Sequence, residues 1–97
     1  MKIQLLYFDG CPNWQVMRAT LAELLAESAS SAEIELVLVE TQEAAEQWRF
    51  RGSPTVLIDG EDPFLETDAP IGLSCRIYQT AEGLAGSPSR DQLQRVL

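Results

Sequence analysis

The stretch FDGCPNW, residues 8 to 14, separates two elements that the sequence predicts with different periodicities. Before it, Lys2 to Phe8 is short, apolar and β-prone, which is typical of a buried strand. After it, apolar residues recur at helical spacing to about Ser28, with charged residues off that stripe. Pro12 suits the first helical position, where its missing N–H costs nothing. We therefore expect a strand, a sharp break containing Cys11, and a helix over about Pro12 to Ser28.

The rest of the chain extends this pattern to the order β-α-β-α-β-β-α. The further strands are predicted at residues 34–39, 54–58 and 75–80, and the further helices at residues 42–48 and about 89–96. Thr41 has the hydroxyl of a helix N-cap. A crossover helix joins the first two strands, so we expect them to be parallel, with helices covering both faces of the sheet. The connection from Gly60 to Gly72 is long for so small a domain, and such connections are often functional.

Length, composition and charge restrict the class of protein. The 97 residues are 45% hydrophobic, enough for one α/β domain spanning residues 1–97. Seven basic and 15 acidic residues give a net charge of −8, which disfavours nucleic acid and membrane surfaces as partners. No apolar run predicts a signal peptide or a membrane span, so we expect a cytoplasmic protein.

The residue types also exclude several kinds of site. The chain has no histidine, which removes imidazole metal sites and Ser-His or Cys-His catalysis. The acidic residues between 59 and 68 lack the alternation and glycine of an EF-hand loop. We therefore expect no metal site and no cofactor. In a reducing compartment the two cysteines are better read as reactive, metal-binding or buried than as a structural disulfide.

The element order and two motifs resemble the thioredoxin-like superfamily, glutaredoxins in particular. Cys11-Pro12 lies at the junction of the first strand and first helix, where that family carries C-x-x-C. Residues 52–55 resemble its G-x-P-T segment, which implies that Pro54 is cis and lies beside the reactive sulfur. The opening FDGCPNW is also similar to small bacterial proteins labelled thioredoxin-like or alkylmercury lyase. The resemblance covers the chain apart from residues 60–72 and implies a thioredoxin-like fold with a central mixed four-stranded sheet.

The chain departs from this family at Trp14, which stands where the second cysteine of the motif would be. The usual dithiol within the motif cannot form, so Cys11 is the candidate catalytic residue. The start of a helix presents free amides and a partial positive charge, and both stabilise a thiolate. The negative charge of Asp9 opposes this effect. The alternative is that Cys11 is an inert buried cysteine.

Four residues around Cys11 are candidates for substrate binding. The resemblance implies that Ser53 and Pro54 align the backbone of an extended substrate beside the sulfur. Pro12 fixes the start of the helix. Trp14 either covers one side of a bound substrate or packs against the sheet.

Cys75 is the second cysteine, and its position relative to Cys11 decides its role. If residues 75–80 form the fourth strand, Cys75 lies about 15 Å from Cys11, a strand length at ~3.3 Å per residue. Only a fold-back of the 60–74 connection would bring the two together. We therefore expect Cys75 to be a small apolar residue on the face of Ile77, with a resolving thiol as the alternative.

The leading hypothesis is a thiol–disulfide oxidoreductase of monothiol type. The Cys11 thiolate would attack a disulfide-containing protein or a mixed disulfide with a low-molecular-weight thiol, and an external thiol would resolve the adduct. Two alternatives remain open. One is a non-catalytic thioredoxin-fold module that binds a protein partner. The other is soft-metal or organomercurial handling by Cys11 and Cys75 with Asp9, since thiolates select soft metals.

Overall fold

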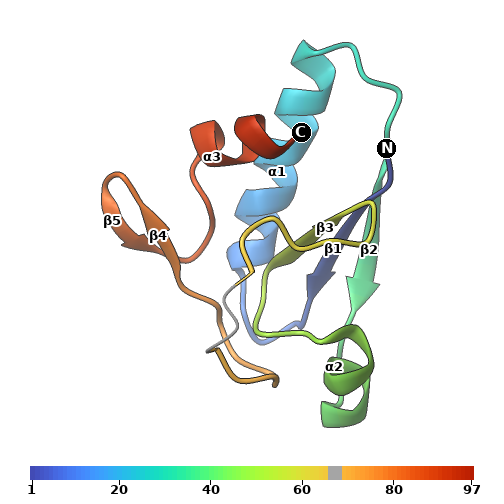
Figure 1. Cartoon of the computed structure of the whole chain (residues 1–97), viewed down its shortest axis with the longest axis vertical. Helices are drawn as coiled ribbons and strands as arrows, with labels where there is room; N and C mark the ends of the chain where they lie inside the picture. The colour runs from blue at the N-terminus through green and yellow to red at the C-terminus, as the bar shows by residue number, and fades with distance from the viewer. Residues whose placement is uncertain (66–68) are drawn as a thin grey trace.

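A small mixed β-sheet lies at the centre of the protein. The computed structural model describes residues 1–65 and 69–97 (Figure 1). Strands β1 (Ile3–Tyr7), β2 (Ile34–Leu38) and β3 (Thr55–Ile58) form the sheet in the order β2-β1-β3. Strand β1 pairs in parallel with β2 and antiparallel with β3. The predicted parallel pairing of the first two strands is therefore confirmed.

Helices pack against both faces of this sheet, as the continuously apolar strands predicted. Helices α1 (Asn13–Glu27) and α3 (Arg90–Val96) lie side by side in Figure 1, and α2 (Gln42–Trp48) lies apart from them. Ile3 and Leu5 belong to a core cluster that contains the apolar residues of α1 and α3. Leu6 belongs to a second cluster on the other face, with residues of α2 and the segment after it.

The predicted ends of the helices are close to those observed. The Thr41 hydroxyl accepts a hydrogen bond from the Ala44 amide at 3.1 Å, so its predicted role as an N-cap is confirmed. Ser89 and Gln92 form a reciprocal capping box at the start of α3. Pro12 occupies the N-cap position of α1, immediately before its first residue. Within residues 1–65 and 69–97, no helix is long and apolar enough to cross a membrane.

The predicted fourth strand of the central sheet is wrong. Strand β4 (Tyr78–Thr80) pairs instead with β5 (Gly83–Ala85) in a separate antiparallel hairpin. The alternation of residues 75–80 predicted a strand correctly but could not identify its neighbour. Its partner strand β5 lies in a stretch for which no strand was predicted. The end of β3 pairs with the turn that follows it, because the Ile58 amide donates to the Glu61 carbonyl at 2.8 Å.

The end of the connection from Gly60 to Gly72 lies beside the segment that precedes β3. The Gly72 amide donates to the Phe50 carbonyl at 3.0 Å, and the Gln42 side chain donates to the Ile71 carbonyl at 3.3 Å. These contacts return the chain to the loop between α2 and β3. Residues 69–77 can therefore lie beside the segment that precedes β3.

Gly52 permits the closest approach between these two segments. Its φ is +121°, a region that side chains rarely adopt. A Cβ on Gly52 would lie 2.9 Å from the Arg76 Cβ and 3.1 Å from the Arg76 Cα. Both backbone conformation and packing therefore require glycine at this position.

We expect Gly52→Ala to lower the free energy of unfolding by about 2–3 kcal/mol, because strain and a backbone clash act together. Gly60→Ala is the matched control. Gly60 has a φ of +86°, but a Cβ there would meet nothing within 4 Å. The Gly60→Ala variant should lose about 1 kcal/mol of the free energy of unfolding, from backbone strain alone. Urea denaturation measures both values, and equal losses would show that the contact with Arg76 is unimportant.

Candidate functional site

Cys11 is completely buried at the turn between β1 and α1. Its side chain has 0% exposure. The thiol donates to the Ser53 carbonyl at 3.6 Å, and the Asn13 side-chain amide donates to the Cys11 sulfur at 3.6 Å. The Cys11 amide donates to the Phe8 carbonyl at 3.3 Å, which fixes the turn. The sulfur is thus held between the start of α1 and the segment before β3.

The carbonyl of Ser53 contacts this sulfur, and the peptide bond between Ser53 and Pro54 is cis. Both residues are fully buried. The Ser53 amide donates to the Ser74 carbonyl at 2.7 Å, and its carbonyl accepts from the Arg76 amide at 2.8 Å. The backbone groups expected to align a substrate are therefore paired with residues 74–76 of the same chain.

Cys75 lies in the middle of that pairing segment. Ser53 and Cys75 form an isolated parallel β-bridge, and the Ser53 carbonyl also accepts the Cys11 thiol. The prediction that a strand length separates Cys75 from Cys11 is wrong, because the long connection folds back. The fold-back that was stated as the condition for proximity is present. The two thiols remain free rather than bonded, with Cys11 buried and Cys75 exposed.

The Cys11 thiol affects the ionisation of Cys75. A hydrogen bond with the Cys11 side chain raises the pKa of Cys75, and burial and the negative charge of an ionised Cys11 raise it further. The physical cause is that two adjacent thiolates repel, whereas a thiolate beside a thiol gains a hydrogen bond. At neutral pH the arrangement therefore favours at most one thiolate in the pair.

Arg76 anchors Cys75 in this position. Its guanidinium is buried and donates to the Asp62 carboxylate at 2.7 Å and to the Thr55 hydroxyl at 3.2 Å. It also donates to the Phe64 carbonyl and lies 4.7 Å from the centre of the Tyr78 ring. A guanidinium is planar and has several N–H donors, so one arginine can fix several segments of the chain at once. The residue after Cys75 is thereby attached to β3, to residues 62–64 and to β4.

Arg76 and Asn13 belong to the site but were not among the residues predicted from the sequence. A charged residue within the alternating run of residues 75–80 was a signal for Arg76, because such a residue is buried only when paired. The sequence held no comparable signal for Asn13, whose contact with sulfur depends on the turn geometry.

Trp14 and Phe50, two aromatic residues near the site, pack against other residues of the chain. Trp14 is half-buried and stacks on Tyr7, with 4.3 Å between ring centres. Its packing against the core was one of the two expectations for it. Pro12 is exposed. Phe50 is a buried core residue, whereas Trp48 is 38% exposed.

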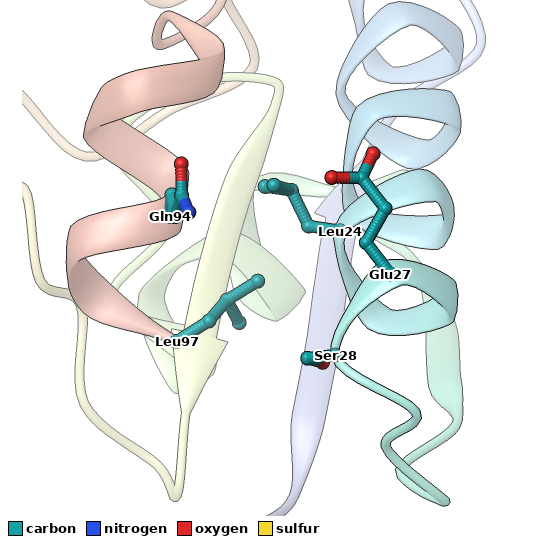
Figure 2. Close-up of a pocket in the computed structure, with 5 residues that line it drawn as sticks. All are labelled: Leu24, Glu27, Ser28, Gln94 and Leu97. Atoms are coloured by element: carbon teal, nitrogen blue, oxygen red, sulfur yellow. The ribbon is translucent and has the colours of Figure 1, made fainter.

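A pocket elsewhere on the molecule is not part of this site. A cleft of about 290 Å³ lies between α1 and α3 and is lined by Leu24, Glu27, Ser28, Gln94 and Leu97 (Figure 2). Its α1 residues are in the last turns of that helix, while Cys11 precedes the first. At ~1.5 Å per residue, Leu24 and Glu27 lie roughly 17–21 Å along the helix from its first residue.

The described residues contain no group of three or more cysteine, aspartate and glutamate side chains placed to hold a metal ion. Two of the acidic residues considered for calcium, Glu66 and Asp68, lie outside the described residues. Comparison of the chain with protein-family models, with curated proteins and with solved structures finds no match. The functional argument therefore depends on the site itself.

Arg76→Met retains the apolar stem but leaves the Asp62 carboxylate without its partner. Removing one member of a buried pair is strongly destabilising, and we expect a loss of about 3 kcal/mol in the free energy of unfolding. Arg90→Met is the control, because Arg90 pairs with exposed Glu23 and Glu27. The free energy of unfolding of Arg90→Met, measured by urea denaturation, should stay close to that of the wild type. If both variants lost equally little, Arg76 would not be an anchor.

The effect of Cys11 on the pKa of Cys75 predicts a pH dependence. Alkylation requires the thiolate, so a raised pKa places the rise in Cys75 alkylation at a higher pH than for an ordinary exposed thiol. Cys11→Ala removes the hydrogen bond and the charge that raise the pKa, so the rise should move to lower pH. Iodoacetamide labelling with peptide mass analysis measures the profile. Ser74→Ala should leave it unchanged, and an unshifted profile in Cys11→Ala would contradict the interaction.

Proposed function

We propose that this protein is a thiol–disulfide oxidoreductase in which Cys11 and Cys75 alternate between a dithiol and a disulfide. The observation that carries the proposal is that both cysteines contact Ser53: the Cys11 thiol donates to the Ser53 carbonyl at 3.6 Å, and Cys75 pairs with Ser53 in a β-bridge. This differs from the monothiol hypothesis, because the resolving thiol now comes from the same chain. No external thiol is needed to release the substrate.

The reaction balances without a cofactor. One thiolate of the pair attacks a substrate disulfide, which forms a mixed disulfide and releases one substrate thiol. The other thiolate then attacks the protein sulfur of that mixed disulfide, which forms the Cys11–Cys75 disulfide and releases the second substrate thiol. Two electrons pass to the substrate, and the two protons of the pair end on the released thiols. An external thiol reductant restores the dithiol.

The surroundings of Cys11 support thiolate chemistry. The sulfur precedes α1, a helix of 15 residues whose first amides and dipole favour negative charge. The Asn13 amide donates to the sulfur, which also favours the anion. These contacts stabilise Cys11 as an attacking group and, in the reverse direction, as a leaving group.

The surroundings of Cys75 support a disulfide in a protein as the substrate. Leu73 and Ile77, two residues on either side of Cys75, are 39% and 61% exposed. Residues 69–81 contain no acidic side chain, although the chain as a whole carries −8. An uncharged surface with exposed apolar side chains fits a polypeptide better than a small anionic disulfide.

We further propose that the chain is a variant of the thioredoxin-like fold. The β1-α1-β2 unit, the antiparallel β3 and the placement of Cys11 opposite Pro54 support this assignment. Among the residues that the structure describes, the central sheet has no fourth strand, and residue 75 forms a bridge with Ser53 just before β3.

The test is reduction of one disulfide in an unfolded protein, with dithiothreitol as the terminal reductant. Cys11→Ser and Cys75→Ser should each lose the rate above that of dithiothreitol alone, and Ser74→Ala should keep it. Full activity in either cysteine variant would exclude the two-thiol cycle. If no variant has activity above background but a partner protein still binds both cysteine variants, the protein is a binding module. Tight Hg²⁺ binding that needs both cysteines, without disulfide exchange, would favour soft-metal handling.

A further inference from the structure

We propose that Cys75, rather than Cys11, is the thiol that bonds to the substrate, and that Cys11 reacts only with Cys75. This inference rests on the proposed function and assigns the two steps of that cycle. It reverses the order expected from the sequence, in which the thiol at the start of α1 attacks first. Three features of the site lead to it.

The first feature is access. Cys11 has 0% exposure, whereas Cys75 is exposed. Thiol–disulfide exchange needs direct contact between the attacking sulfur and a sulfur of the substrate. An external disulfide can reach Cys75 in the structure as it stands, but it cannot reach Cys11.

The second feature is that the cover over Cys11 is firmly attached. Residues 74–76 hold Ser53 through two backbone hydrogen bonds of 2.7 and 2.8 Å. Arg76, with its buried contacts to Asp62 and Thr55, extends that attachment. Exposing Cys11 would require these contacts to break together. The cover is therefore part of the fold rather than a loose flap.

The third feature closes the site from another direction. The Asn13 side chain that donates to the Cys11 sulfur is packed against Gly86, just after β5. A Cβ on Gly86 would lie 2.2 Å from the Asn13 side-chain nitrogen. Gly86 thus packs against the side chain that contacts the Cys11 sulfur.

These positions give each sulfur a distinct part in the exchange. The Cys75 sulfur forms a bond with one substrate sulfur, the substrate S–S bond breaks, and the other substrate sulfur leaves and takes up the proton that Cys75 gave to solvent. Cys11 then attacks the Cys75 sulfur from within, and the second substrate thiolate leaves. In the reverse direction an external thiolate attacks the Cys75 sulfur of the disulfide. Cys11 then leaves with the electron pair, as a thiolate stabilised by Asn13 and the start of α1.

Trapping with a neutral aromatic disulfide, 2,2′-dithiodipyridine, tests the assignment. Cys11→Ser should form a stable adduct at Cys75, with release of one pyridinethione. Cys75→Ser should react at least about tenfold more slowly, because its remaining thiol must wait for local opening. Serine at position 75 keeps the backbone pairing with Ser53. Intact mass and thione absorbance measure both rates, and in concentrated urea the two variants should react equally fast.

The wild-type protein gives an independent readout that needs no variant. Early acid quenching should find the first adduct at Cys75, followed by the Cys11–Cys75 disulfide and a second pyridinethione. A first adduct at Cys11, or a Cys75→Ser variant that reacts as fast as Cys11→Ser, would overturn the assignment. These results are separate from the proposed function. Loss of turnover in both cysteine variants with a first adduct at Cys11 refutes only the order of steps, whereas turnover without either cysteine refutes the cycle itself.

Discussion

The pairing of Arg76 with Asp62 is the interaction on which the geometry of the site depends. Moving a guanidinium and a carboxylate out of water is costly, and a buried ion pair adds little net stability compared with apolar side chains. The ion pair instead fixes the position of the segment around Arg76, because Arg76 also donates to Thr55 and Phe64. An apolar side chain would fill the same space without fixing the register of the segment. The ion pair thus specifies where Cys75 lies.

A thiol pair formed by Cys11 and Cys75 differs physically from one within a C-x-x-C motif. The two residues are 64 positions apart, so a disulfide between them closes a long loop. In the chain-entropy model such a crosslink stabilises the folded state by about 4 kcal/mol, whereas a four-residue loop gains far less. In the proposed cycle, reduction of this pair would remove that stabilisation, and the redox state of the site would be coupled to the attachment of residues 69–77.

The sequence predicted the elements that depend on local pattern and missed those that depend on distant pairing. The strand and helix around FDGCPNW, the Thr41 cap and the parallel first two strands follow from periodicity and capping chemistry, and all are present. The alternation of residues 75–80 could not show that β4 would pair with β5. The fold-back depends on contacts such as Gly72 to Phe50 and on the close approach at Gly52. Separate parts of the chain make these contacts, so no local pattern records them.

The same limit applies to the roles of the two cysteines. The helix start after Cys11 is a local feature that predicts a favourable environment for a thiolate, whereas the Asn13 amide donor is visible only in the structure. Reactivity toward an external disulfide also requires access, and access at Cys11 is decided by residues 74–76 and Gly86. The two properties therefore fall on different residues: the buried Cys11 sulfur accepts the Asn13 amide, and Cys75 is the exposed thiol. A pair divided in this way is suited to an exchange in which the two thiols act in sequence, and both cysteines contact Ser53.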